Sequence, residues 1–160
     1  MQLVFSSAIF LITALVHLTI IYPHPTRAFD GLHALLLYLP AVIFSVIAFT
    51  SQAIVVGFTG SAIDSGRVIP GPLYREYNVY ILLGYVLALV ILWRKMVRSG
   101  GDQRKNISIF WWSILIGGLA PIVIDVLIPI FTNGLYPNAL IGNISTVIWL
   151  GATTYIVLKK

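Results

Sequence analysis

The segment that decides the fold is residues 3–22, which reads LVFSSAIFLITALVHLTIIY. It contains no Lys, Arg, Asp or Glu side chain, and its length matches the run of about 20 apolar residues that a helix needs to cross a bilayer. It ends at Pro23-His24-Pro25, where each proline removes a backbone donor. Because no basic leader and no convincing small-residue cleavage site accompany it, we expect a retained transmembrane helix rather than a signal peptide.

Four further apolar runs follow this segment. They span about residues 32–54, 77–93, 107–131 and 140–158. Only 9% of the 160 residues are charged and 59% are hydrophobic, whereas a soluble domain carries about 25% charged residues. Only helices and closed barrels satisfy every backbone hydrogen-bonding group in lipid, and these runs are continuous rather than alternating. The sequence predicts an all-α fold, an integral membrane helical bundle of about five transmembrane helices that forms one domain over residues 1–160.

The basic residues indicate an orientation. With five crossings, one side of the membrane receives eight Lys and Arg residues and the other side receives two. The eight are Arg27, Arg94, Lys95, Arg98, Arg104, Lys105, Lys159 and Lys160, and the two are Arg67 and Arg75. Positive residues remain preferentially in the cytoplasm. We therefore predict a multi-pass plasma-membrane protein with its N-terminus outside and its C-terminus cytoplasmic, whose net charge of +5 faces anionic lipid rather than nucleic acid.

Residues 55–75 form the longest link between apolar runs and are predicted to lie outside the cell. Links longer than about 12 residues are usually functional or disordered. The valine, isoleucine and phenylalanine content of this link argues against disorder. We expect a short strand or a hairpin that folds over the outer ends of the helices.

Signatures of catalysis are missing from the sequence. There is no His-Glu-x-x-His motif, no phosphate-binding Walker loop and no Gly-x-Ser-x-Gly elbow. The chain has no cysteine, its histidines His17, His24 and His33 are scattered, and no two carboxylates are suitably paired. We therefore predict no enzymatic activity, no metal site and no cofactor.

Asp125 is the one acidic residue deep within an apolar run. An acid at membrane depth usually faces the bundle interior or a water-filled cavity. Polar residues expected at the same depth come from the third and fifth runs. They are Arg75, Tyr77 and Asn78, and Asn143, Ser145 and Thr146. Two interpretations remain open: a hydrogen-bonded acid that locks helix packing, and a polar ligand pocket that opens outward.

Several short stretches are together characteristic of a family. They are Tyr22-Pro23-His24-Pro25, Leu39-Pro40-Ala41, Gly71-Pro72-Leu73-Tyr74, Arg94-Lys95-Met96-Val97-Arg98-Ser99-Gly100, Gly117-Gly118, Ile128-Pro129 and Tyr155-Ile156-Val157. The chain resembles the seven-helix membrane sensor region at the amino terminus of many bacterial and archaeal histidine kinases. The resemblance covers nearly the whole chain, as helices three to seven of that region.

The resemblance implies a sensory or signal-input module without its own catalytic domain. The first two helices of the family pattern and the kinase domain are absent, and Asp125 stands where the family often has a neutral polar residue. The expected partners are the lipid bilayer, a small-molecule ligand at the outer face, and an output-domain protein or a second copy of the chain. The first alternative is a small transporter or channel subunit, which would need ionisable groups at several depths. A second alternative, a membrane enzyme, is disfavoured by the missing acid–base and metal groupings.

Overall fold

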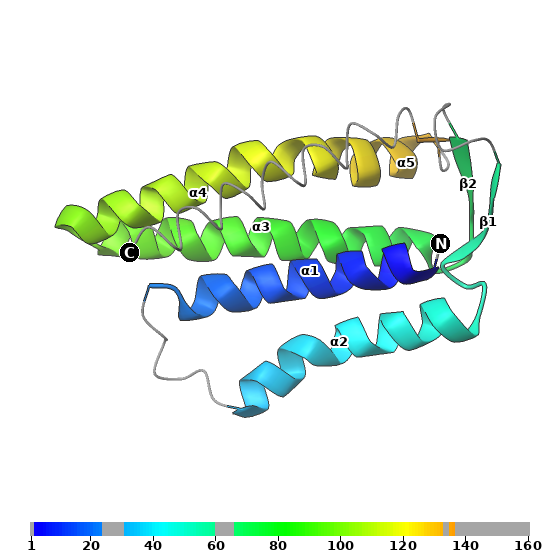
Figure 1. The fold of residues 1–160 in the computed structure, drawn as a ribbon, viewed down its shortest axis with the longest axis horizontal. Helices are drawn as coiled ribbons and strands as arrows, with labels where there is room; N and C mark the ends of the chain where they lie inside the picture. The colour runs from blue at the N-terminus through cyan, green and yellow to red at the C-terminus, as the bar shows by residue number, and fades with distance from the viewer. Residues whose placement is uncertain (1, 24–30, 60–65, 133–134, 137–160) are drawn as a thin grey trace. The chain divides into compact units, whose positions relative to one another are not determined.

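The computed structural model describes residues 2–23, 31–59, 66–132 and 135–136. Long helices dominate it (Figure 1): α1 (Gln2–Ile21), α2 (Gly31–Thr50), α3 (Tyr74–Arg98) and α4 (Gly101–Pro121). In the described part of the chain, four helical stretches are long and apolar enough to cross a membrane. The predicted all-α membrane bundle is confirmed. The predicted fifth crossing, residues 140–158, lies outside the described residues.

The helix ends differ from the predicted ones in a systematic way. α3 continues five residues beyond the predicted Trp93, and α4 begins six residues before the predicted Ile107. Both extensions consist largely of Arg, Lys, Gln and similar residues, which form helices well but end an apolar run. α2 instead stops four residues before the predicted end. There the Ser51 hydroxyl accepts a hydrogen bond from the backbone N–H of Ala53 at 3.2 Å, a local contact that competes with helix continuation.

A tight turn joins α3 to α4. Only Ser99 and Gly100 separate the two helices. Gly101 has a φ of 53°, a left-handed conformation that only glycine adopts without strain. The Ser99 hydroxyl donates to the carbonyl of Lys95 at 2.8 Å, and the N–H of Arg104 donates to the carbonyl of Gly100 at 3.3 Å. These hydrogen bonds fix the backbone of the turn.

The link after α2 contains the predicted strands. β1 (Val55–Thr59) lies beside β2 (Gly66–Pro70), and β2 pairs antiparallel with β3 (Leu135–Tyr136). The sequence predicts a short strand or a hairpin in this link, and the two strands confirm it. The third strand is not predicted, because its two residues are too few to give an alternating pattern.

The chain divides into two compact units. The first comprises residues 1–56 and 70–91, and the second comprises residues 57–69 and 92–160. The first therefore contains α1, α2 and most of α3, and the second contains the end of α3 together with α4. Each is described by itself below, and the single domain expected over the whole chain stays a prediction.

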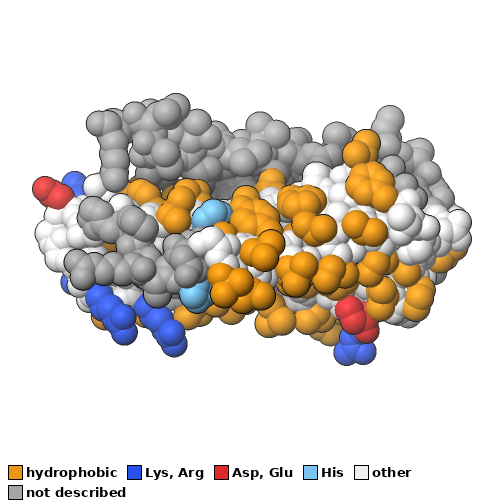
Figure 2. Space-filling model, turned by 90° about the horizontal axis from the view of Figure 1, so that it is seen from below, with side chains coloured by type: hydrophobic (Ala, Val, Ile, Leu, Met, Phe, Trp, Pro, Cys, Tyr) orange, Lys and Arg blue, Asp and Glu red, His pale blue; other side chains and the backbone are white. Residues whose placement is uncertain are grey.

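Small residues allow close helix packing in the first unit. Ala41, Ser45 and Ala48 are the buried residues of α2 and lie along one face of it. Gly84 of α3 lies so close to α1 that an added Cβ would stand 2.9 Å from Cγ1 of Ile12. The side of the molecule that Figure 2 shows is largely hydrophobic, and many large apolar side chains of α2 are exposed. Such a surface is suited to lipid and would be unfavourable in water.

After the C-terminal end of α4, the helix continues with a different hydrogen-bonding pattern. Residues Ile122–Leu127 form a π-helix, which leads into the short α5 (Ile128–Phe131). The N–H of Ile128 donates to the carbonyl of Val123, five residues earlier. Pro129 has no N–H to donate, so neither of the carbonyls four and five residues before it receives a bond from that position. A proline that loosens the backbone in this way is a physical reason for the irregular segment.

Candidate functional site: a polar seam in the first unit

Three polar residues of α1 lie on one face of the helix. Ser6, Thr13 and His17 are separated by seven and four residues, which places them within roughly 40° of one another around a helix with 3.6 residues per turn. Ser6 and Thr13 are buried and His17 is half-buried. Polar side chains within a membrane-spanning segment need hydrogen-bond partners from neighbouring helices.

Three hydrogen bonds join this face of α1 to α2 and α3. The Tyr77 hydroxyl donates to the carbonyl oxygen of Phe5 at 2.6 Å. The Tyr80 hydroxyl lies 3.1 Å from Oγ1 of Thr13. Because Thr13 already donates to the carbonyl of Ile9 at 2.8 Å, Tyr80 must be the donor.

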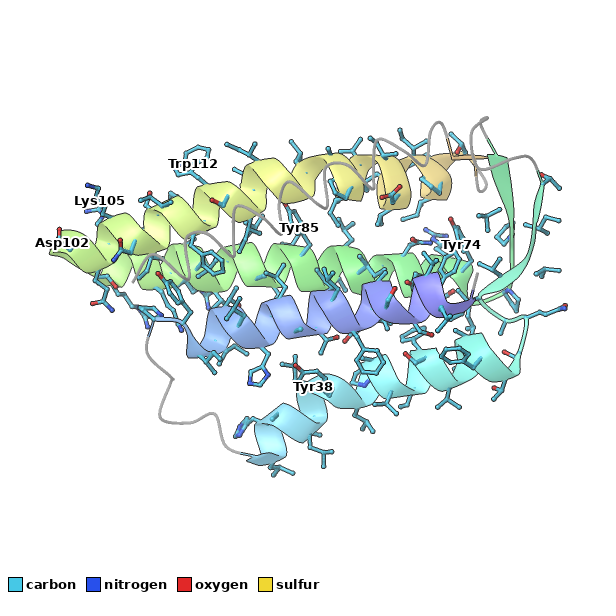
Figure 3. The ribbon with its side chains drawn as sticks, in the orientation of Figure 1. Tyr38, Tyr74, Tyr85, Asp102, Lys105 and Trp112 are labelled. Carbon is cyan, nitrogen blue, oxygen red and sulfur yellow. The ribbon has the colours of Figure 1, made fainter. Side chains whose placement is uncertain are left out.

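The third hydrogen bond connects α1 with α2. Nδ1 of His17 and the Tyr38 hydroxyl are 3.1 Å apart, and the two rings meet edge to face with centroids 5.6 Å apart. Figure 3 shows Tyr38 on the side of α2 that faces α1. α1 is therefore hydrogen-bonded to both of its neighbours in this unit.

Aromatic rings surround the contacts that Tyr77 and Tyr80 make with α1. The Tyr77 ring packs edge to face against Phe5 and Phe44, with centroid distances of 5.4 and 6.1 Å. Phe44 also lies 5.7 Å from the Tyr80 ring. Tyr77 is 2% exposed. The aromatic packing holds the two tyrosine hydroxyls in place against α1.

Two buried hydroxyls in the same unit have no hydrogen-bond partner among the residues that the structure describes. They are Oγ of Ser6 on α1 and Oγ of Ser45 on α2, in residues that are 6% and 7% exposed. Buried Asn78, by contrast, donates through Nδ2 to the carbonyl of Tyr74 at 2.8 Å. We call this whole set the polar seam: Ser6, Thr13, His17, Tyr38, Ser45, Tyr77, Asn78 and Tyr80.

The predicted site residues are distributed unevenly. Tyr77 and Asn78 belong to the polar seam, whereas Arg75 is exposed in the first turn of α3 and takes no part in the hydrogen bonds described above. Asp125 is half-buried in the π-helix of the second unit. Asn143, Ser145 and Thr146 lie outside the described residues. The predicted outer cluster around Asp125 therefore stays a prediction.

Apart from the two residues of α3 named above, the polar seam is not predicted from the sequence. His17 stands out there only as a scattered histidine, and Ser6, Thr13 and Tyr80 do not stand out at all. A signal was present, because Ser6 and Thr13 are seven residues apart, and so are Tyr38 and Ser45 on α2. Seven residues are nearly two turns, so each pair marks a polar stripe on one helix face.

The polar seam offers hydroxyl, imidazole and amide groups but no charged cluster. Among the described residues, no three His, Cys, Asp or Glu side chains are grouped so that they could hold a metal ion. Comparisons with protein-family models, curated proteins and solved structures find no match for this chain.

Proposed function

We propose that this chain is a multi-pass membrane signal-input module that performs no catalysis of its own. The observation that supports the proposal is the polar seam, in which α1 is held to its neighbours by a few hydrogen bonds while two buried hydroxyls nearby are unpaired. Hydrogen bonds between membrane helices contribute only about 0.6 kcal/mol each on average. The unpaired hydroxyls offer alternative partners, so a small movement of one helix exchanges contacts at little cost.

Such exchange is what a two-state sensor requires. A ligand shifts a conformational equilibrium when it binds one arrangement more tightly than the other. In the proposed orientation the N-terminus is outside, and Tyr77 and Asn78 lie towards the outer end of α3. A small molecule at the outer face would perturb them there. α3 is one continuous helix from Tyr74 to Arg98, so a rotation or shift of it carries the signal to its cytoplasmic end. The C-terminus is predicted to lie on the same side of the membrane, where an attached output domain, an output-domain protein or a second copy would read the signal.

The test is a fusion of a histidine-kinase output domain after Lys160, reconstituted in membranes. Thr13→Val removes the hydrogen bond with Tyr80, and Tyr38→Phe removes the one with His17. Loss of about 0.6 kcal/mol from one state changes a two-state equilibrium about threefold, so basal autophosphorylation should change by a similar factor.

The matched control is Thr50→Val. Thr50 is exposed and its hydroxyl bonds only to its own helix, at the carbonyl of Val46. This variant should leave autophosphorylation unchanged. Equal autophosphorylation in the unmodified fusion and both polar-seam variants, with all proteins folded by circular dichroism, would contradict the proposal.

A small transporter is the second candidate, and one observation favours it. Ser6, Thr13 and His17 place polar groups at successive depths along α1, roughly 10 Å and 6 Å apart at 1.5 Å per residue. Transport pathways need polar groups at several depths. Proteoliposomes loaded with a pH-sensitive dye distinguish the candidates: proton flux above that of empty vesicles, lost in His17→Ala, supports transport, and its absence supports the signal-input module.

A further inference from the structure

We infer that the α3–α4 turn holds the headgroup of an anionic phospholipid whose acyl chains lie along one exposed face of α4. This site belongs to the second unit and does not depend on the proposed signalling role. It rests on three features of that unit: a concentrated positive charge, a fixed turn, and an apolar face that continues from the charged end into membrane depth.

The charge is concentrated within twelve residues. From Arg94 to Lys105 the chain carries five basic side chains and one acidic side chain, Asp102, for a formal net charge of +4. Arg98, Arg104 and Lys105 are all exposed. Such groups at a membrane surface attract anionic lipid by about 1 kcal/mol each.

The turn brings basic groups from two helices together. Arg98 is the last residue of α3, and Arg104 is in the first turn of α4. Because only Ser99 and Gly100 separate the helices and both helix ends are hydrogen-bonded to them, the backbone that carries these groups is preorganised. The turn therefore places one exposed arginine at the end of each helix, and arginine is well suited to bind phosphate.

An apolar face continues from this charged end. Lys105, Ile109, Trp112, Ile116 and Leu119 follow one another at spacings of four and three residues, which places them on one face of α4. The last four are 43%, 52%, 69% and 52% exposed. Figure 3 shows Lys105 and Trp112 projecting from the same side of the helix. A phospholipid has the same division, with a charged head and apolar chains.

The tryptophans mark the depth at which head and chains meet. Trp112 lies about 10 Å along the axis from Lys105, which takes it from the headgroup layer to the edge of the hydrocarbon. Trp111 packs against Trp93 and Trp112, with centroid distances of 5.4 and 5.0 Å. Tryptophan prefers this interfacial level. The order of basic groups, tryptophan and aliphatic side chains therefore matches the order of phosphate, glycerol and acyl chain in a lipid.

The test uses Trp112 as the reporter in the full chain. Replacing Trp93, Trp111 and Trp149 with Phe leaves Trp112 as the single tryptophan. The protein is placed in vesicles that contain brominated lipid, which quenches tryptophan on contact. We expect brominated phosphatidylglycerol, which is anionic, to quench Trp112 more strongly than brominated phosphatidylcholine at the same lipid fraction.

Charge variants then locate the site. Each of Arg98→Gln, Arg104→Gln and Lys105→Gln should lower the preference for phosphatidylglycerol up to about fivefold, the equivalent of about 1 kcal/mol. Asp102→Asn should raise the preference, because it removes a negative charge from the turn. Arg75→Gln is the matched control, since Arg75 is an exposed arginine at the opposite end of α3 and should leave quenching unchanged.

Two results would overturn the inference. One is equal quenching by the two lipids, or a preference that the three basic-residue variants leave intact. The other is loss of the preference when inorganic phosphate is added at constant ionic strength, because the turn would then be a site for free phosphate rather than for a lipid. Persistence of the preference in phosphate supports the lipid assignment.

Discussion

At Gly71 two segments of backbone approach so closely that no side chain fits. The N–H of Gly71 donates to the carbonyl of Ile54 at 2.9 Å, and the N–H of Leu73 donates to that of Ala53 at 2.8 Å. A Cβ added at Gly71 would overlap the carbonyl oxygens of Ala53 and Gln52. These contacts lie between backbones, so neither side can move aside as a flexible side chain would.

We expect Gly71→Ala to lower the free energy of unfolding by about 2 kcal/mol, in the range of other overpacked sites. Thermal unfolding of the purified protein in detergent measures it. Gly31→Ala is the control, because nothing lies within 4 Å of a Cβ added at Gly31, and its unfolding temperature should not fall. Equal stability of Gly71→Ala and the original protein would mean that the two segments are not in contact.

The hydrogen bond between Thr13 and Tyr80 is open to a double-mutant cycle. Thr13→Val and Tyr80→Phe each remove one partner of the 3.1 Å contact while nearly preserving the side-chain volume. The expected coupling energy is about 0.6 kcal/mol, the average for hydrogen bonds between membrane helices. Unfolding of both single variants and the double variant in detergent measures it. Additive effects of the two changes would show that the hydroxyls do not interact.

At the scale of the element, two adjacent glycines, Gly100 and Gly101, lie at the junction of α3 and α4. Only one of these two positions requires glycine. Gly101 has a φ of 53°, whereas the φ of Gly100 is −120°, and nothing lies within 4 Å of a Cβ added at either. Gly101→Ala should therefore destabilise the protein by roughly 1–2 kcal/mol through backbone strain alone. Gly100→Ala should not destabilise the protein. Thermal unfolding of the two variants and the original protein in detergent measures the difference. Equal loss in both variants would point to crowding instead of strain.

Sequence reasoning located the helices better than it located their ends. An uncharged run such as residues 3–22 has only one stable form in lipid, so its helix was predictable. The helix ends depend on different physics. Arg94 and Arg104 are excluded from hydrocarbon but form helices readily in water, so α3 and α4 extend past the apolar runs. The early end of α2 depends on a local bond of Ser51, which hydropathy does not register.

The candidate site was less predictable for a related reason. Tyr77 and Asn78 were singled out because they are polar near a helix end, but the carbonyl of Phe5 on α1, which accepts a hydrogen bond from Tyr77, was not. Pairing Thr13 with Tyr80 requires knowing which faces of α1 and α3 meet. Gly84 helps to determine these faces, because the absence of a side chain lets α3 approach Ile12 of α1 closely. A single sequence shows which polar residues share a face of each helix, but it does not show which helix faces pack against one another.

At the scale of the whole molecule, the proposed orientation depends on the end of each membrane-spanning helix at which the basic residues lie. The first residue of α3, Tyr74, lies near Gln52, which follows the C-terminal end of α2, and the last residue, Arg98, leads into the basic turn. It is 25 residues long, about 37 Å at 1.5 Å per residue, which exceeds the hydrocarbon thickness. If α3 spans the membrane, Gln52 and Arg104 must lie on opposite sides of it, whatever the orientation.

The chain has no cysteine, so single-cysteine variants report each side without background. Gln52→Cys and Arg104→Cys replace exposed residues. In intact cells we expect a membrane-impermeant maleimide to label the first variant and to label the second only after permeabilisation, because the five basic residues of the turn disfavour its translocation. The reverse pattern would place the basic turn outside and would reject the proposed orientation. The length and composition of α3 and the positive charge at one end all predict that it crosses the membrane. Labelling of both variants in intact cells would mean that it does not.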